Sequence, residues 1–244
     1  MSFITDFYSI LREYGLLLLI GQYPYGPLGG LVNTLILSTI AMAFAIPVGL
    51  LLAIARLSPW AWVRRPATVW IYLLRSIPLL LIVFWTYFLV PALLGFSISG
   101  FSVMACTLVL YQSTYLCEII RGGILALHPS QGEAARSLGL GYWRTLIWVT
   151  LPQALFNTLP SLISQFIYIL KETTLGHVIN VEEMTSAASQ INNTILTRPF
   201  HVFFILAISY YFISVGLSQM VAWIERRIVR KRQGMQGVTD VSAN

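Results

Sequence analysis

Few charged side chains lie within the apolar stretches of this chain, and Arg75 is the most deeply placed. It stands about nine residues inside a long apolar run, where a charge near the bilayer centre costs about 2.5 to 3.5 kcal/mol. Such an arginine can attract a substrate carboxylate, pair with Glu118 in the next apolar run, or extend back to the membrane surface. These three interpretations stay open from the sequence alone.

A second polar group follows a later apolar stretch and carries charges of both signs. Its residues are Lys171, Glu172, Thr173 and Thr174. A zwitterionic amino acid would meet complementary charges and two hydroxyls there. We therefore expect these four residues, with Arg75, to line a substrate pathway, although a solvated loop can have the same composition.

The sequence contains no set of residues spaced for catalysis or for metal binding. His128, His177 and His201 are scattered, and neither HExxH nor GxSxG occurs. Cys106 and Cys117 lie in one apolar run without CxxC spacing, which predicts reduced cysteines that serve in packing. We expect a protein that is not an enzyme and binds neither a metal nor a cofactor itself.

The elements that position these residues are predicted to be membrane-spanning helices. Of the 244 residues, 57% are hydrophobic and 10% are charged, which is too little charge to cover a soluble globule of this size. A span needs roughly 20 mostly apolar residues. Five stretches qualify: roughly 31–55, 67–90, 101–120, 153–170 and 199–224. The predicted fold is an all-α, polytopic membrane protein with about five transmembrane helices.

Two of these predicted spans contain residues that interrupt or polarise them. Pro78 removes a backbone hydrogen bond from the second span, which predicts a kink near Arg75. The fourth span suits a helix packed inside a bundle, because it carries Asn157, Pro160, Ser161, Ser164 and Gln165.

The basic residues predict which ends of the spans face the cytoplasm. Eleven of the fifteen Lys and Arg residues follow the first, third or fifth span. Because cytoplasmic loops are enriched in Lys and Arg, we expect the amino terminus outside and the carboxyl terminus in the cytoplasm. The net charge of +6 thus reflects topology and not nucleic-acid binding. The eleven are Arg56, Arg64, Arg65, Arg121, Arg136, Arg144, Arg226, Arg227, Arg230, Lys231 and Arg232.

Two terminal segments flank the predicted transmembrane domain of residues 26–229. Residues 1–25 form an amino-terminal interfacial segment, in which 3–20 are expected to be an amphipathic helix on the outer membrane surface. Residues 230–244 begin with basic residues and then turn polar, which predicts a disordered cytoplasmic tail.

A polar segment, QGEAARSLGLGYWRTLIWVTLPQAL (131–155), separates the third and fourth spans. Ser130 and Glu133 fit a capping box, and Gly139 supplies a left-handed residue that ends the helix, so a short helix is predicted over about 130–139. About two turns of helix are not stable alone in water, so we expect this helix to dock against another surface. A second helix then leads into the fourth span.

The spacing in this segment resembles the signature of the membrane subunits of bacterial ABC importers. That signature is EAA, three residues, Gly, nine residues, a branched aliphatic residue, one residue and Leu-Pro. Val149 stands where isoleucine is usual, which is a conservative difference. The residues at the signature positions are Glu133, Ala134, Ala135, Gly139, Val149, Leu151 and Pro152.

The resemblance implies the fold of a type I ABC importer permease with a cytoplasmic coupling helix. In that family the coupling helix sits in a groove of an ATPase subunit and passes its motion to the spans. A plain re-entrant connector, in which Glu133 only caps its own helix, is the alternative. The implied partners are a dimer of ATP-binding subunits, a related or identical second permease subunit, a periplasmic amino-acid-binding protein and membrane lipid.

Three further stretches resemble the polar-amino-acid branch of the family. The first is most similar to glutamate/aspartate permease subunits, which implies import by alternating access across the bacterial cytoplasmic (inner) membrane. Glutamate or aspartate is the first expectation, and other polar amino acids follow closely. The stretches are LRSIPLLLIVFWTYFLVP (74–91), TYLCEIIRGGI (114–124) and LKETTLGHVINVEEM (170–184).

The sequence predicts that another chain hydrolyses ATP. GxxxxGK[ST] is absent, and the two lysines, Lys171 and Lys231, follow no glycine-rich loop, so ATP and Mg²⁺ are expected on the partner. The alternative is an ion-coupled secondary amino acid transporter without an ATPase partner, which would use intramembrane carboxylates and often has internal repeats. Because the predicted spans hold almost no acidic residue besides Glu118, the importer is preferred.

Overall fold

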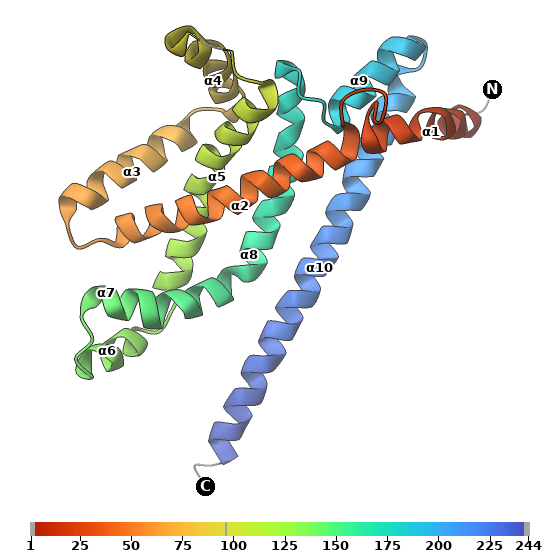
Figure 1. Ribbon diagram of the computed structural model, residues 1–244. Coiled ribbons are helices and arrows are strands. Elements are labelled where there is room, and N and C mark those ends of the chain that lie inside the picture. The colour runs from red at the N-terminus through yellow and green to blue at the C-terminus, as the bar shows by residue number, and fades with distance from the viewer. Residues whose placement is uncertain (1–2, 96, 242–244) are drawn as a thin grey trace.

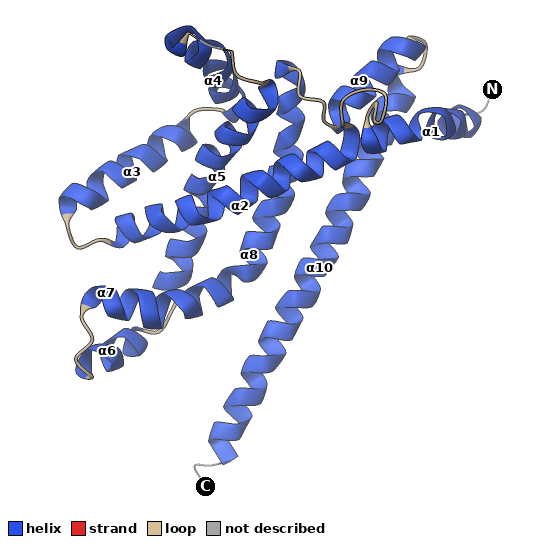
Figure 2. Ribbon diagram, viewed as in Figure 1, coloured by secondary structure: helices blue, strands red, loops and turns tan. Residues whose placement is uncertain are grey.

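The computed structural model describes residues 3–95 and 97–241, and nearly all of that length is helical (Figures 1 and 2). This part of the chain holds no strand, apart from an isolated bridge between Gly21 and Leu28. The elements are α1 (Phe3–Ile20), α2 (Gly30–Leu57), α3 (Ala61–Ser76), α4 (Leu79–Leu94), α5 (Gly100–Leu125), α6 (Pro129–Ser137), α7 (Tyr142–Thr145), the π-helical turn η1 (Leu146–Thr150), α8 (Leu151–Glu172), the 3-10 helix η2 (Thr173–Ile179), α9 (Met184–Ile195) and α10 (Pro199–Val241).

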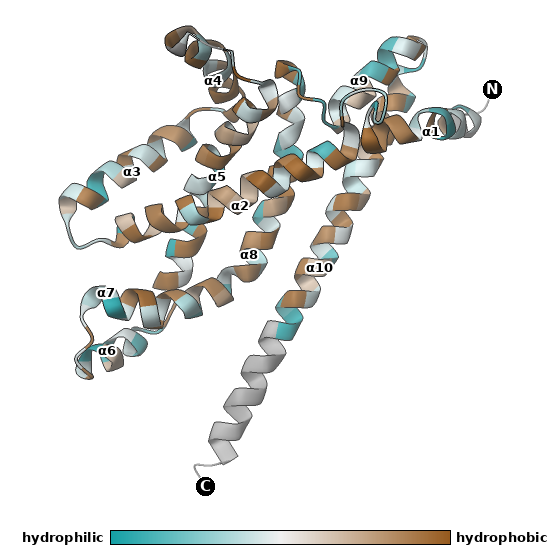
Figure 3. Cartoon of the chain, viewed as in Figure 1, coloured by the Kyte–Doolittle hydropathy of each residue, from teal (hydrophilic) through white to brown (hydrophobic). Residues whose placement is uncertain are grey.

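Four helical stretches among the described residues are long and apolar enough to cross a membrane. They are Gly30–Leu57, Gly100–Leu125, Tyr142–Ile179 and Pro199–Arg227, and they contain the first, third, fourth and fifth predicted spans. The second predicted span is divided between α3 and α4, which meet at 100°. Counting that bent pair as one span gives five. Figure 3 shows hydrophobic residues all along these helices, as burial in a bilayer requires.

The break between α3 and α4 corrects the prediction of one kinked helix over 67–90. Ile77 has an extended backbone, with φ −103° and ψ 131°, and Pro78 precedes the first residue of α4. A proline disfavours the helical conformation of the residue before it and donates no N–H. Both effects act at the bond between Ile77 and Pro78, so α3 ends there and Arg75 lies in its last turn.

The centre of the bundle is the crossing of α2 and α5, which make the most extensive contact in the structure (Figure 1). Gly49 lies at this crossing. A Cβ at Gly49 would stand 2.8 Å from the Cβ of Leu116 and 2.9 Å from the carbonyl oxygen of Ser113. Small residues let membrane helices approach closely, so Gly49 sets the separation of the two central helices.

The two ends of the bundle carry different elements (Figure 1). One end holds α1, α4 and α9, and the other holds α6, α7 and the carboxyl-terminal end of α10. The helix predicted over 3–20 forms as α1 and packs against α2, α9 and α10, with an ion pair of 3.0 Å between Asp6 and Arg198. Its opposite face exposes Tyr8, Leu11, Leu16 and Leu19. The position of α1 relative to lipid stays a prediction.

Helix α10 is longer than the predicted fifth span. It continues as helix to Val241, whereas the sequence predicts disorder from residue 230. A helix that has already formed gains one hydrogen bond for each residue added, and the Arg, Lys and Gln residues of this stretch are good helix formers. Residues 242–244 of the predicted tail lie outside the described residues.

Candidate functional site

The short helix predicted over about 130–139 forms as α6, but it begins differently from the prediction. His128 is the N-cap, and its Nδ1 accepts a hydrogen bond of 3.3 Å from the backbone N–H of Ser130. Pro129 takes the first helical position, where its fixed φ is favourable and its missing N–H costs nothing. The proposed Ser130–Glu133 capping box is therefore wrong, because the proline moves the helix start one or two residues earlier.

The end of α6 agrees with the prediction for Gly139. Its φ is 85°, in the left-handed region that favours glycine. The N–H of Gly139 bonds to the carbonyl of Arg136 at 2.9 Å, and the N–H of Leu140 bonds to that of Ala135 at 3.1 Å. This pair of bonds is a Schellman motif, which stops the helix and turns the chain toward α7.

Helix α6 has an inner and an outer face. Gly132 and Ala135 are buried, and Gly132 lies near the methyl group of Thr145. Glu133 and Ala134 are exposed, as is Leu138, with 84% of its surface accessible. Of the two signature alanines, one therefore packs inward and the other is available to a partner.

We call α6 and α7, residues 129–145, the coupling segment, after the role that the resemblance predicts for it. Its contacts to the spans are few. The hydroxyl of Tyr142 donates a hydrogen bond to the carbonyl of Leu57 at the end of α2. The chain then continues through η1 into α8, where Leu151 and Pro152 form the first turn. The second helix, predicted to begin at Tyr142, is therefore continuous with the fourth span, with the π-helical turn between them.

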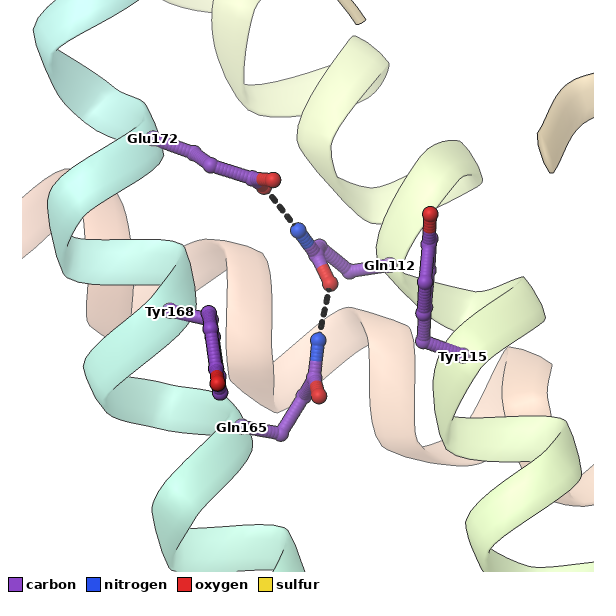
Figure 4. A pocket seen from close by; sticks show the side chains of 5 residues that line it. All are labelled: Gln112, Tyr115, Gln165, Tyr168 and Glu172. Atoms are coloured by element: carbon purple, nitrogen blue, oxygen red, sulfur yellow. Dashed lines mark hydrogen bonds between the residues drawn. The ribbon is translucent and has the colours of Figure 1, made fainter. Parts of the chain in front are cut away.

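A polar groove lies between α5 and α8 (Figure 4). Gln112 and Tyr115 line it from α5, and Gln165, Tyr168 and Glu172 line it from α8. Gln112 is buried and bridges the two helices, because its Nε2 donates to the Glu172 carboxylate and its Oε1 accepts from Gln165. This orientation makes Glu172 an acceptor at the groove.

Arg75, on α3, does not line this groove but contacts Tyr115, which does. Its guanidinium carbon lies 4.6 Å from the centroid of the Tyr115 ring, a cation–π distance. Tyr115 also shares a hydrogen bond of 3.2 Å with Tyr111, one turn earlier on α5. The groove region therefore holds a cation beside Tyr115 and a carboxylate at Glu172, the two charges that an amino acid zwitterion needs.

The structure separates the four predicted pathway residues that follow the fourth span. Lys171 and Glu172 end α8, and only Glu172 lines the groove. Lys171 is exposed, and the hydroxyl of Thr174 donates a hydrogen bond of 2.7 Å to the Lys171 carbonyl. Thr173 is fully buried and donates to the Leu170 carbonyl at 2.7 Å, so its side chain faces the interior of the bundle and does not line the groove. Local helix continuation, which places successive residues about 100° apart, separates these side chains.

Sequence reasoning did not identify Gln112, Tyr115 and Tyr168 as groove residues. One signal was available, because Gln165, Tyr168 and Glu172 are spaced i, i+3 and i+7 and therefore share one face of a helix. The pairing of that face with Gln112 depends on how α5 and α8 cross, which the sequence does not reveal.

The charges further along α5 pair with one another and with α2. Glu118 bonds to Arg121 on the same helix at 2.8 Å, as the spacing predicts, and also pairs with Arg56 on α2. Glu118 is therefore not the partner of Arg75. Among the described residues, no three His, Cys, Asp or Glu side chains gather into a set that could hold a metal ion.

Comparisons with known proteins identify the family. Residues 45–230 match the family described as binding-protein-dependent transport system inner membrane component. The inner membrane amino-acid ABC transporter permease protein YhdY of Escherichia coli (strain K12) is 34% identical over 82% of this chain, which spans 55% of that relative's length. The glutamate/aspartate import permease protein GltK of Escherichia coli O157:H7 is 32% identical, with 82% of this chain and 92% of the relative covered. The probable glutamine ABC transporter permease protein GlnP of Bacillus subtilis (strain 168) is also 32% identical, with 81% and 91% covered.

Solved structures give the same result for the fold. A chain in the crystal structure of an amino acid ABC transporter with histidines superposes with a TM-score of 0.80 at 32% identity, covering 91% of this chain and 98% of that one. A chain of the inward-facing MetNI methionine ABC transporter has a TM-score of 0.63 at 20% identity, covering 79% and 93%, which shows likeness of fold. The chain therefore belongs to the inner membrane components of binding-protein-dependent transport systems, and it is a permease subunit with the type I ABC importer fold.

Proposed function

We propose that this chain is the permease subunit of an ATP-driven importer that moves a polar amino acid into the cell by alternating access. The observation that carries the proposal is the coupling segment. It presents Glu133, Ala134 and Leu138 on an exposed face of α6 at one end of the bundle, while Gly132 and Ala135 pack inward. An exposed, pre-formed short helix with a protruding leucine suits docking into a groove of a second protein.

The proposed assembly contains three kinds of partner. Two ATP-binding subunits would bind and hydrolyse ATP with Mg²⁺, and a periplasmic binding protein would deliver the amino acid. A second permease subunit, identical or related, would complete the pathway, because the groove between α5 and α8 is open on one side. In this arrangement the amino terminus and α1 lie outside, and the coupling segment and carboxyl terminus lie in the cytoplasm, in keeping with the basic residues Arg64, Arg65 and Arg144 at that end.

The groove supports an amino acid as the substrate. Glu172 would receive the α-ammonium group, and Arg75 beside Tyr115 would receive the α-carboxylate. Glutamate or aspartate is the first substrate we propose, from the resemblance of residues 74–91. Glutamine is the neutral competitor, because the amide groups of Gln112 and Gln165 in the groove can hydrogen-bond an uncharged amide side chain.

The decisive experiment begins with purification of the tagged chain in mild detergent together with its partners. The complex is then reconstituted in proteoliposomes, and ATP hydrolysis and uptake of labelled glutamate, aspartate and glutamine are measured with and without binding protein. We expect Glu133→Arg to abolish uptake and the stimulation of ATP hydrolysis by binding protein. Unchanged uptake and stimulation would refute the role of α6.

A matched control separates docking from a general charge effect. Glu225→Arg makes the same charge change on an exposed position of α10 and is expected to leave both activities intact. Purification of the chain without any ATP-binding protein, in several detergents, would instead favour the ion-coupled secondary transporter.

A further inference from the structure

The junction between the coupling segment and α8 is wound as a π-helical turn. The backbone N–H of Leu151 bonds to the carbonyl of Leu146, five residues back, in place of the four-residue step of an α-helix. One extra residue is thereby inserted into an otherwise continuous helix from Tyr142 to Glu172. Single π-helical turns of this kind interrupt the regular hydrogen-bond ladder at a defined place.

Pro152 explains why the ladder is interrupted here. It has no N–H, so one carbonyl in the preceding turn loses its normal donor. Two side chains donate hydrogen bonds to other carbonyls of the same turn. The Nε2 of Gln153 donates to the carbonyl of Val149 at 2.8 Å, and the hydroxyl of Thr150 donates to the carbonyl of Leu146 at 3.0 Å. The π-helical turn is therefore bound by side-chain amide and hydroxyl groups in addition to its backbone hydrogen bonds.

The turn lies between two parts of the protein that have different tasks. On one side, α6 packs against it, with Gly132 next to Thr145. On the other side, α8 carries Gln165 and Glu172 to the groove. A hollow of about 230 Å³ borders the turn and is lined by Arg136, Leu146 and Thr150, together with the ends of α2 and α5. The coupling segment thus has space to shift relative to the spans.

We propose that Gln153 is a positioning residue, which holds the π-helical turn and thereby sets the rotation of the coupling segment about the axis of α8. Loss of the inserted residue from the ladder would turn everything before it by about 100° relative to α8. When the π-helical turn keeps one conformation, a displacement of α6 moves α8 and so reaches the groove. A frayed turn would bend instead, and α8 would not move. This inference rests on the proposed role of α6 in coupling.

The test uses the reconstituted complex with its ATP-binding subunits and binding protein. In Gln153→Met the side chain keeps its length and loses its donor. We expect ATP consumed per amino acid imported to rise several-fold while ATP hydrolysis itself changes little. Amide hydrogen exchange at residues 146–151 is expected to quicken about fivefold, the factor that corresponds to one hydrogen bond of about 1 kcal/mol.

Three further variants make the result specific. Gln153→Arg restores a donor and is expected to recover the wild-type ratio, and Thr150→Val removes the other bond and is expected to act like Gln153→Met. Gln219→Met makes the same change at an exposed position of α10 and is expected to have no effect.

The outcomes distinguish this inference from the proposed function. If Glu133→Arg blocks transport while Gln153→Met keeps the wild-type ratio and exchange rates, the role of Gln153 is wrong and the coupling role of α6 stands. If Glu133→Arg has no effect, the proposed function itself is wrong, and altered exchange in Gln153→Met would then report local stability alone.

Discussion

The hydroxyl of Tyr142, at the start of α7, donates a hydrogen bond to the carbonyl of Leu57, the last residue of α2. The last four carbonyls of a helix have no partner within the helix, so this bond both completes the end of α2 and attaches the coupling segment to it. The coupling segment is therefore attached to the first span by this contact, in addition to its covalent continuity with α5 and α8.

Tyr142→Phe is expected to weaken that attachment with little other change. One hydrogen bond is worth about 1 kcal/mol, which for a chain of this size corresponds to a fall of about 2 to 4 °C in melting temperature. Thermal unfolding of the purified protein in detergent measures it. Tyr211→Phe, on an exposed position of α10, serves as the control and should leave the melting temperature unchanged.

Gly49 and Gly216 offer a matched pair of glycines in transmembrane helices. An alanine Cβ at Gly49 would meet Leu116 and Ser113 at less than 3.0 Å, so Gly49→Ala is expected to destabilise the protein by about 1 to 3 kcal/mol. At Gly216 on α10 a Cβ meets nothing within 4 Å, so Gly216→Ala is expected to be neutral or to stabilise by up to about 1 kcal/mol. Equal melting temperatures for the two variants would contradict the close crossing of α2 and α5.

Glu183 predicts a dependence of stability on pH. It is fully buried at the N-cap of α9, where it accepts hydrogen bonds from the N–H groups of Thr185 and Ser186 and from the hydroxyl of Tyr210. Burial raises the pKa of Glu183 to about 7, although these hydrogen bonds oppose the rise. No basic side chain pairs with Glu183 among the residues whose side chains the structure describes.

A raised pKa in the folded state means that the protonated form is favoured by folding. The stabilisation is fully present below the unfolded value of about 4.5 and is lost as pH rises through about 7. We expect the melting temperature of the wild-type protein to fall relative to that of Glu183→Gln as the pH rises from 5 to 8. Parallel curves for the two proteins over this range would show that Glu183 is not the group responsible.

Glu172→Gln tests the charge of the groove. Glutamine can still accept the hydrogen bond from Gln112, so the bridge between α5 and α8 is kept while the negative charge is removed. If Glu172 binds the ammonium group of the substrate, the KM for uptake is expected to rise about tenfold with a similar kcat, because a hydrogen bond to a charged group is worth about 1.5 kcal/mol or more. Glu225→Gln on α10 is the control, and an unchanged KM in Glu172→Gln would exclude Glu172 from the binding site.

Most of the helices, and the place of the coupling segment between the third and fourth spans, could be predicted from the amino-acid sequence. Spans are recognisable because apolar length is a local property, and Gly139 ends α6 as predicted because a left-handed residue acts on its own turn. Local reasoning was wrong where two signals competed. Pro129 moved the start of α6 to His128, and Ile77 with Pro78 ended α3 where a kink was expected.

Which polar residues meet across helices could not be predicted from the sequence, because it depends on how the helices pack. Gln112 joins Gln165 and Glu172, and Glu118 pairs with Arg56, because α5 crosses α8 and α2 at particular depths and rotations. Those crossings depend on side-chain packing along whole helices, such as the close approach at Gly49, and not on any short stretch of sequence. Local helix geometry turns Thr173 and its neighbour Glu172 in different directions, but which of these directions faces the groove depends on the same crossings.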